Sequence, residues 1–196
     1  MRMLLLVLMS CVVPVPVLAA ESILPDDSIY RLDATFSDQA GTTFTLATRR
    51  GRPQLVAMFY TSCRYVCPLI VDSAKGVEHA LSESERERLS ILLVSLDPAR
   101  DDTAALKSVF DRRKLDPTRW TLARTSDRNV RSLAALLGVR YRALADGEFN
   151  HTSSLVLLDA DGRRLESSSA LGAKPDPEFL AAVRKALAPA SPAPSP

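Results

Sequence analysis

Two cysteines, Cys63 and Cys67, lie four residues apart between an apolar segment and a segment with helical periodicity. The apolar segment, residues 55–60, shows no alternation, which is typical of a strand buried on both faces. Pro68 suits the first turn of a helix, because proline lacks a backbone N–H, so we expect a strand, a loop and a helix that begins close to Pro68. The helix dipole and the charge of Arg64 favour anions there, so both sulfurs are predicted to ionise readily to thiolates. Such a pair can close a disulfide or bind a soft metal ion.

The first 20 residues have the layout of a secretory signal peptide: Arg2 precedes an apolar stretch that ends in Ala19 and Ala20. We expect this segment to be cleaved, which predicts an exported, periplasmic protein. Two alternatives stay open, an uncleaved anchor that holds the protein at the outer face of the inner membrane, and a lipoprotein acylated at Cys11. Membrane association is expected only through this N-terminal segment.

The composition favours one exported domain without affinity for nucleic acid. The 196 residues include 25 Lys and Arg against 23 Asp and Glu, a balance that gives no electrostatic reason to bind nucleic acid. Residues 21–188 are enough for a single domain, and the Pro, Ala and Ser of residues 189–196 predict a disordered tail. Cleavage would leave Cys63 and Cys67 as an even pair in a compartment where disulfides persist.

The remaining pattern predicts an α/β protein with a thioredoxin-like fold: a central mixed sheet flanked by helices, with an added N-terminal β-hairpin. Elements expected from periodicity and turn residues are a hairpin at 34–46, a buried strand at 91–96, a further strand at 120–123, a strand from 155 that turns at 159–162 into an antiparallel partner, and a last helix from 176. Residues 82–88 are expected as a charged link and residues 141–150 as a polar loop. The cysteine loop then lies at the carboxyl end of the first core strand, where open α/β sheets bind ligands.

His151 adds a third donor to the two sulfurs. It stands at the predicted entrance to the strand that begins at 155, which this architecture brings close to the cysteine loop. A neutral imidazole there is a borderline metal ligand. The other histidine, His79, falls about three turns from Cys67 and is expected at the surface. Asp97 and Asp101 follow the second core strand, either shaping the loop beside the site or serving as strand-end and helix-cap residues.

The chain resembles the Sco/SenC family of copper-binding, thioredoxin-like proteins. The resemblance rests on Phe59-Tyr60-Thr61-Ser62-Cys63-x-x-x-Cys67-Pro68, on Asp97-Pro98-x-x-Asp101 and on His151-Thr152. It implies copper bound by Cys63, Cys67 and His151, as Cu(I) and also as Cu(II). Two thiolates and an imidazole suit Cu(I) on softness grounds as well.

The resemblance further implies a metallochaperone that delivers copper to a respiratory copper enzyme, such as the dinuclear copper site of cytochrome c oxidase, or that reduces the cysteines of that enzyme. The implied partners are a subunit of the respiratory enzyme, an upstream thiol reductant and a copper donor. The chain departs from the family pattern at two places: family members commonly carry Pro-Asp between the cysteines, where this chain has Arg64-Tyr65-Val66, and Asp before the histidine, where it has Asn150.

An alternative function is a thiol–disulfide oxidoreductase or redox sensor that acts through Cys63 and Cys67, so the sequence leaves open whether the protein is an enzyme. Thioredoxin-type reductases have two residues between their cysteines and a proline opposite them, whereas this chain has three residues and no proline between Pro117 and Pro175. A structural zinc site is excluded on ligand count, because such sites take four ligands and His79 is expected far from the cysteine pair.

Overall fold

The structure, a computed structural model of the chain, describes residues 23–63 and 66–189. The predicted signal peptide with Cys11, the Arg64 charge and residues 190–196 of the predicted tail lie outside the described residues. The α-helices are α1 (Val66–Ala80), α2 (Glu83–Arg86), α3 (Thr103–Arg112), α4 (Asp127–Leu137) and α5 (Pro177–Leu187), and Ile29–Arg31 and Leu46–Arg49 form short 3₁₀ helices. The strands are β1 (Thr35–Asp38), β2 (Thr43–Thr45), β3 (Gln54–Phe59), β4 (Ser90–Ser95), β5 (Trp120–Arg124), β6 (Tyr141–Ala143), β7 (Phe149–His151), β8 (Leu155–Leu158) and β9 (Arg164–Ser168).

Seven strands form a central mixed sheet in the order β2-β1-β5-β4-β3-β8-β9. Strands β3, β4 and β5 run parallel, as expected for strands joined by helices, while β8 is antiparallel to β3 and to β9. The N-terminal hairpin of β1 and β2 extends this sheet, because β1 pairs antiparallel with β5. The predicted architecture is therefore confirmed, including the added hairpin.

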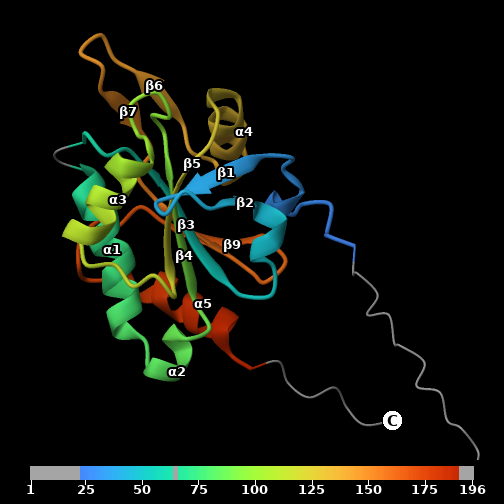
Figure 1. The fold of residues 1–196 in the computed structure, drawn as a ribbon. Coiled ribbons are helices and arrows are strands. Elements are labelled where there is room, and N and C mark those ends of the chain that lie inside the picture. The colour runs from blue at the N-terminus through green and yellow to red at the C-terminus, as the bar shows by residue number, and fades with distance from the viewer. Residues whose placement is uncertain (1–22, 64–65, 190–196) are drawn as a thin grey trace, which may run out of the picture.

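Helices cover both faces of the sheet, with α1 and α3 on one face and α4 on the other (Figure 1). Both α1 and α3 connect neighbouring parallel strands in the same direction, and right-handed crossovers place such helices on one face. The start of α1 is thereby placed directly beyond the carboxyl end of β3, and α3 lies next to it.

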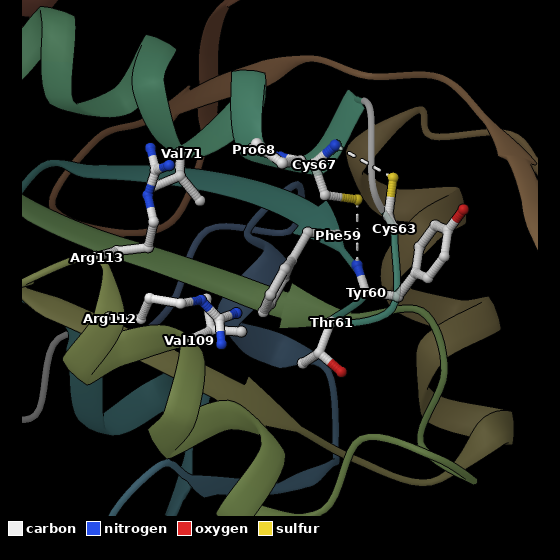
Figure 2. A pocket seen from close by; sticks show the side chains of 10 residues that line it. All are labelled: Phe59, Tyr60, Thr61, Cys63, Cys67, Pro68, Val71, Val109, Arg112 and Arg113. Atoms are coloured by element: carbon white, nitrogen blue, oxygen red, sulfur yellow. Dashed lines mark hydrogen bonds between the residues drawn. The ribbon is translucent and has the colours of Figure 1, made fainter.

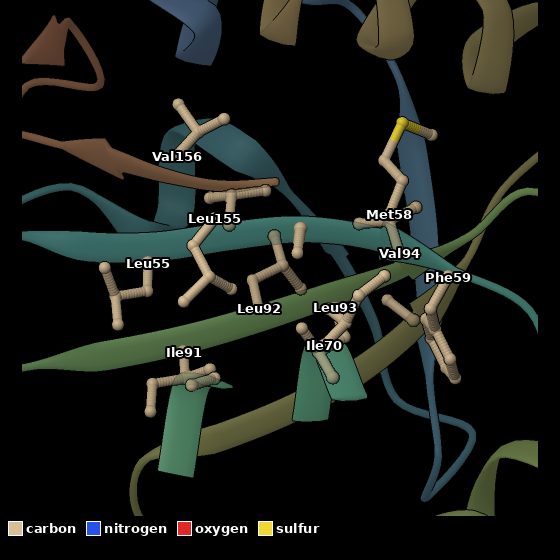
Figure 3. Close-up of a cluster of buried hydrophobic side chains, with 14 of the residues drawn as sticks. Leu55, Met58, Phe59, Ile70, Ile91, Leu92, Leu93, Val94, Leu155 and Val156 are labelled. Atoms are coloured by element: carbon tan, nitrogen blue, oxygen red, sulfur yellow. The ribbon is translucent and has the colours of Figure 1, made fainter. Parts of the chain in front are cut away.

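The core is built on strand β3, in which every residue is buried. Its side chains alternate between the two helical layers: Figure 3 shows Met58 and Phe59 pointing to opposite faces, with Ile70 of α1 on the side of Phe59. This two-sided burial explains why residues 55–60 show no polar alternation.

The parallel register of β3 and β4 aligns their carboxyl ends. Phe59 pairs with Ser95, and the backbone N–H of Leu96 donates to the Phe59 carbonyl at 2.7 Å. The cysteine loop after β3 and the turn containing Asp97 and Asp101 after β4 therefore meet at one edge of the sheet.

Two segments differ from their predictions. Residues 82–88, expected as a link, contain the short helix α2, because Ser82 and Glu85 cap its first turn reciprocally. Residues 141–150, expected as a polar loop, contain β6 and most of β7, a two-stranded ribbon separate from the central sheet. Asp146-Gly147 supplies the turn, with Gly147 at φ 82°, and an Asp-Gly pair is a common hairpin signal.

In the described part of the chain, no helix is both long and apolar enough to cross a bilayer.

Candidate metal centre

Backbone amides hold both sulfurs of the cysteine loop. The N–H of Tyr60 donates to Cys67 Sγ at 3.4 Å, and the N–H of Cys67 donates to Cys63 Sγ at 3.3 Å (Figure 2). Cys67 lies in the first turn of α1 and is 4% exposed, whereas Cys63 is half-buried. The cysteines thus occupy the predicted strand–loop–helix junction but differ in their access to solvent.

The prediction that both sulfurs ionise readily is wrong for Cys67. Burial raises the pKa of the Cys67 thiol, and the nearby Cys63 raises it further, against a lowering by the backbone hydrogen bond from Tyr60. The loss of hydration for a buried thiolate outweighs the helix terminus that the sequence reasoning relied on. At neutral pH the resting form of Cys67 is a thiol.

His151 approaches the sulfur of Cys67, with 4.0 Å between Nε2 and Sγ. Its Nδ1 lies 3.1 Å from the carbonyl oxygen of Thr152, and a carbonyl only accepts, so Nδ1 carries the hydrogen. Burial lowers the pKa of the ring. The neutral imidazole therefore directs the lone pair of Nε2 toward Cys67, which is the state of a histidine that ligates a metal.

The predicted site residues are brought together in part. Cys67 and His151 approach each other, and Cys63 contacts the backbone of Cys67. As they stand, no three Cys, His, Asp or Glu side chains of residues 23–63 and 66–189 converge into a ready-made metal site. Two sulfurs and an imidazole fit a soft metal ion by donor type. His79, by contrast, is exposed on α1 as expected.

The position of His151 is set by the ribbon of β6 and β7, not by the entrance to β8 as predicted. His151 is the last residue of β7 and pairs with Tyr141, and β8 begins only at Leu155. The ribbon is held to the body of the protein by residues that the sequence reasoning missed as site residues. Tyr60 donates through its hydroxyl to Glu148 at 2.8 Å, and its ring meets the His151 ring edge-on with centroids 5.9 Å apart.

A second attachment joins the tip of the ribbon to the turn after β4. Arg100 donates through its guanidinium to the carbonyl of Gly147 and forms an ion pair with Asp97. Asp97 is buried, so this pair fixes Arg100 from the side of the sheet. The resemblance had singled out the segment of Asp97, and here it positions the ribbon that carries His151.

Asp101 anchors the cysteine loop itself. Its fully buried carboxylate accepts hydrogen bonds from the backbone N–H and the hydroxyl of Thr61 and from the hydroxyl of Ser95. The N-cap of α3 is Asp102, which accepts from the N–H of Ala105 at 2.8 Å. Of the two roles left open for Asp101, the structure shows the shaping of the loop.

The family model for SCO1/SenC matches residues 27–188, which is most of the chain and the whole of the described site. This chain belongs to the SCO1/SenC family. A Stutzerimonas stutzeri protein named for copper binding is 23% identical over 172 residues, which covers 82% of this chain and 83% of that protein.

Two solved structures share the thioredoxin-like fold of this SCO1/SenC chain. One is Bradyrhizobium japonicum ScoI with copper bound, with a TM-score of 0.64 and 23% identity, covering 78% of this chain and 96% of ScoI. The other is BsSco, a member of the Sco family of cytochrome c oxidase assembly proteins in which a disulfide switch was identified, with a TM-score of 0.66 and 22% identity, covering 78% and 90% of the two chains.

Asn150, the residue before the histidine that the sequence analysis noted as a departure from the expected pattern, is exposed and pairs with Arg142 across the ribbon. The ring of His151 is held instead by the main-chain carbonyl of Thr152. Because a backbone carbonyl is kept whatever residue stands at position 150, the partner of Nδ1 is independent of this departure.

Proposed function

We propose that this protein carries copper as cargo, bound by Cys63, Cys67 and His151, and serves as a metallochaperone in the assembly of cytochrome c oxidase. The observation that carries the proposal is the 4.0 Å approach of the neutral His151 ring to Cys67 Sγ. Membership of the SCO1/SenC family supports it, as do the copper bound to ScoI and the place of BsSco among cytochrome c oxidase assembly proteins.

The chemistry of the donors selects the ion. Cu(I) favours soft thiolate ligands and accepts imidazole, and Cu(II) also binds imidazole and thiolate. The raised pKa of Cys67 means that the ion must displace a proton from that sulfur. Copper affinity should therefore increase with pH in the neutral range.

Titration with Cu(I) against a competing Cu(I) chelator tests the proposal on the reduced protein. We expect one Cu(I) per chain, loss of this binding in a Cys63→Ser, Cys67→Ser double variant and a lower affinity in His151→Ala. His79→Ala is the matched control, because this second histidine is exposed on α1. Unchanged stoichiometry in the double cysteine variant would contradict the proposal.

Delivery of copper and reduction of the client's cysteines are two modes of the same assembly role, and the chain offers a variant that separates them. A thiol reductase needs Cys63 and Cys67 but no imidazole ligand, whereas copper delivery needs all three side chains. His151→Ala should therefore abolish maturation of the dinuclear copper site if delivery is the essential step and leave it intact if reduction is. Both modes need an upstream thiol reductant, and delivery also needs a copper donor.

The second candidate function, thiol–disulfide exchange or redox sensing without copper, is favoured by the unequal exposure of the two sulfurs. Cys63 is half-buried and Cys67 is buried, an arrangement suited to one attacking and one resolving thiol. This function would be favoured if the protein exchanged with a disulfide substrate in copper-free buffer and if this activity alone supported full maturation of the oxidase.

We also propose that residues 21–188 are the copper-binding domain, exported to the periplasm by residues 1–20, with residues 189–196 as a disordered tail. N-terminal sequencing of the periplasmic protein should give a chain that begins near Glu21. Recovery only with membranes, with the leader intact or with Cys11 acylated, would assign the anchored form at the outer face of the inner membrane.

A further inference from the structure

A small cavity opens beside the two cysteines, between α1 and α3. It has a volume of about 110 Å³, and Figure 2 shows its residues around Phe59 at the end of β3. Val71 of α1 and Val109 of α3 contribute to its apolar lining, and Cys63 and Cys67 line the end nearest the loop. The cavity therefore leads from an apolar wall to the sulfurs.

The size of this cavity excludes a drug-sized or cofactor-sized ligand, because such sites usually measure roughly 300–1,000 Å³. A volume of about 110 Å³ suits a single side chain. An apolar side chain presented by a protein partner is the occupant that fits both the size and the lining.

Two arginines at the rim of the cavity favour a partner segment that carries a negative charge. Arg113 forms an ion pair with Asp72, whereas the guanidinium of Arg112 donates to the hydroxyl of Ser108 at 3.2 Å. Among residues 23–63 and 66–189, Arg112 has no carboxylate partner, and it is exposed. A guanidinium in this state pairs favourably with a carboxylate of an incoming chain.

We propose that this cavity docks a segment of a partner protein in which a cysteine is followed by an apolar residue and then by an acidic residue. The apolar side chain fills the space between Val71 and Val109, the carboxylate meets Arg112, and the partner's sulfur meets Cys63, the more exposed of the two thiols. The inference deepens the proposed function, on which it rests, by naming the recognition chemistry of the client.

This docking favours a thiol–disulfide exchange in two steps. The thiolate of Cys63 attacks one sulfur of the partner's disulfide, which forms a mixed disulfide and expels the other partner sulfur as a thiolate. Cys67, after loss of its proton, attacks the Cys63 sulfur and releases the second partner thiolate. Two electrons pass to the partner, whose two thiolates take up protons from the solvent that received the proton of Cys67, and Cys63 and Cys67 end as a disulfide.

The test uses reduced full-length protein with Cys11→Ser, which leaves Cys63 and Cys67 as its thiols, and two end-blocked tripeptides, Cys-Leu-Asp and Cys-Leu-Lys, each with its thiol joined to 2-thiopyridine as a mixed disulfide. Attack by Cys63 on the peptide sulfur releases 2-thiopyridone, and its absorbance gives the rate constant. We expect the Asp peptide to react about fivefold faster than the Lys peptide at low salt, with the preference falling as salt is added.

Arg112→Glu should abolish or invert this preference. Lys107→Glu is the matched control, because it makes the same charge change on α3 at a residue outside the cavity lining, and it should leave the preference in place. The mercaptoethanol mixed disulfide with 2-thiopyridine reports intrinsic thiol reactivity, and each variant's rate constants for the two peptides are divided by its rate constant for this reagent.

Equal rates for the two peptides in the wild-type protein, or a preference that survives Arg112→Glu, would overturn the docking inference. The assay contains no copper, so the two proposals fail separately. If the protein prefers the Asp peptide but binds no Cu(I), the docking inference stands and the copper proposal fails. If it binds Cu(I) but shows no peptide preference, the copper proposal stands and the docking inference fails.

Discussion

The hydroxyl of Tyr60 donates a hydrogen bond of 2.8 Å to the carboxylate of Glu148 and accepts one of 3.3 Å from the N–H of Phe149. Tyr60 directly follows strand β3, Phe149 is the first residue of β7, which ends in His151, and Glu148 directly precedes β7. These two bonds connect the strand that carries the cysteine loop to the ribbon that carries the imidazole. The spacing of His151 and Cys67 therefore depends on a tyrosine that supplies no ligand.

Tyr60→Phe tests this connection. The change keeps the ring and removes the hydroxyl, so Glu148 and the N–H of Phe149 lose their partner. We expect about a tenfold loss in Cu(I) affinity, the size of effect typical when the support of a metal ligand is removed, with one Cu(I) still bound. Chelator competition measures it. Tyr141→Phe, in the same ribbon, is the control, and an equal loss there would contradict a specific role for Tyr60.

Asp101→Asn should destabilise the protein by about 2–4 kcal/mol, because a buried carboxylate that accepts bonds from Thr61 and Ser95 is replaced by an amide that cannot accept all of them. Urea unfolding measures the change. The neighbouring Asp102→Asn is a matched control, because Asn serves as an N-cap as well as Asp does, so its stability should change little. Equal stability of the two variants would show that Asp101 is not the anchor of the cysteine loop.

Gly162→Ala should cost more stability than Gly51→Ala. Both glycines have positive φ, 82° and 100°, so each substitution strains the backbone by about 1–2 kcal/mol. A Cβ at Gly162 would also lie 2.5 Å from the Tyr30 ring, whereas nothing lies within 4 Å at Gly51. The added overlap should cost a further ~1–3 kcal/mol. Thermal or urea unfolding of both variants gives the comparison, and equal losses would reject the close packing of Tyr30 on the turn.

The stability of the protein should fall as the pH drops below the pKa of His151 in the unfolded chain. In this range the histidine is protonated in the unfolded chain but still neutral in the folded protein. Burial lowers the pKa of this ring in the folded state, and an unfolded histidine titrates near pH ~6.5. The unfolded state therefore binds more protons below pH ~6.5, and the loss continues until the folded ring also protonates. NMR titration of the ring, assigned with His79→Gln, measures the pKa of His151 in the folded state, and urea unfolding at several pH values measures the loss of stability. A His151 pKa above 6.5 in the metal-free protein would contradict the burial argument.

Oxidised protein should take up no Cu(I), because copper and a disulfide between Cys63 and Cys67 require the same sulfurs. Uptake measured at set ratios of reduced to oxidised glutathione should follow the fraction of free thiol. The Cys63→Ser, Cys67→Ser variant, which cannot be oxidised in this way, supplies the baseline. Undiminished uptake by the fully oxidised protein would contradict the redox control of copper binding.

Local sequence was sufficient to predict the architecture, because each helix or strand depends on signals that lie a few residues apart. The unbroken apolar run of residues 55–60 led to β3, the turn at 159–162 led to the antiparallel pair of β8 and β9, and the signals at 176 led to the start of α5. The same reasoning placed Cys63 and Cys67 at the start of α1. Asp146-Gly147 was an available signal for the β6–β7 ribbon that was not used.

The electrostatic state of the site depended on long-range packing, which local patterns do not contain. Residue spacing put Cys67 at a helix N-terminus, where a thiolate is favoured, but the burial of its sulfur against the rest of the fold raised the pKa instead. The tautomer of His151 and its 4.0 Å approach to Cys67 follow from the ribbon, which is held by Tyr60 at a separation of 88 residues from Glu148. Desolvation and such distant hydrogen bonds are properties of the folded chain, so they appear only once the strands have been assembled.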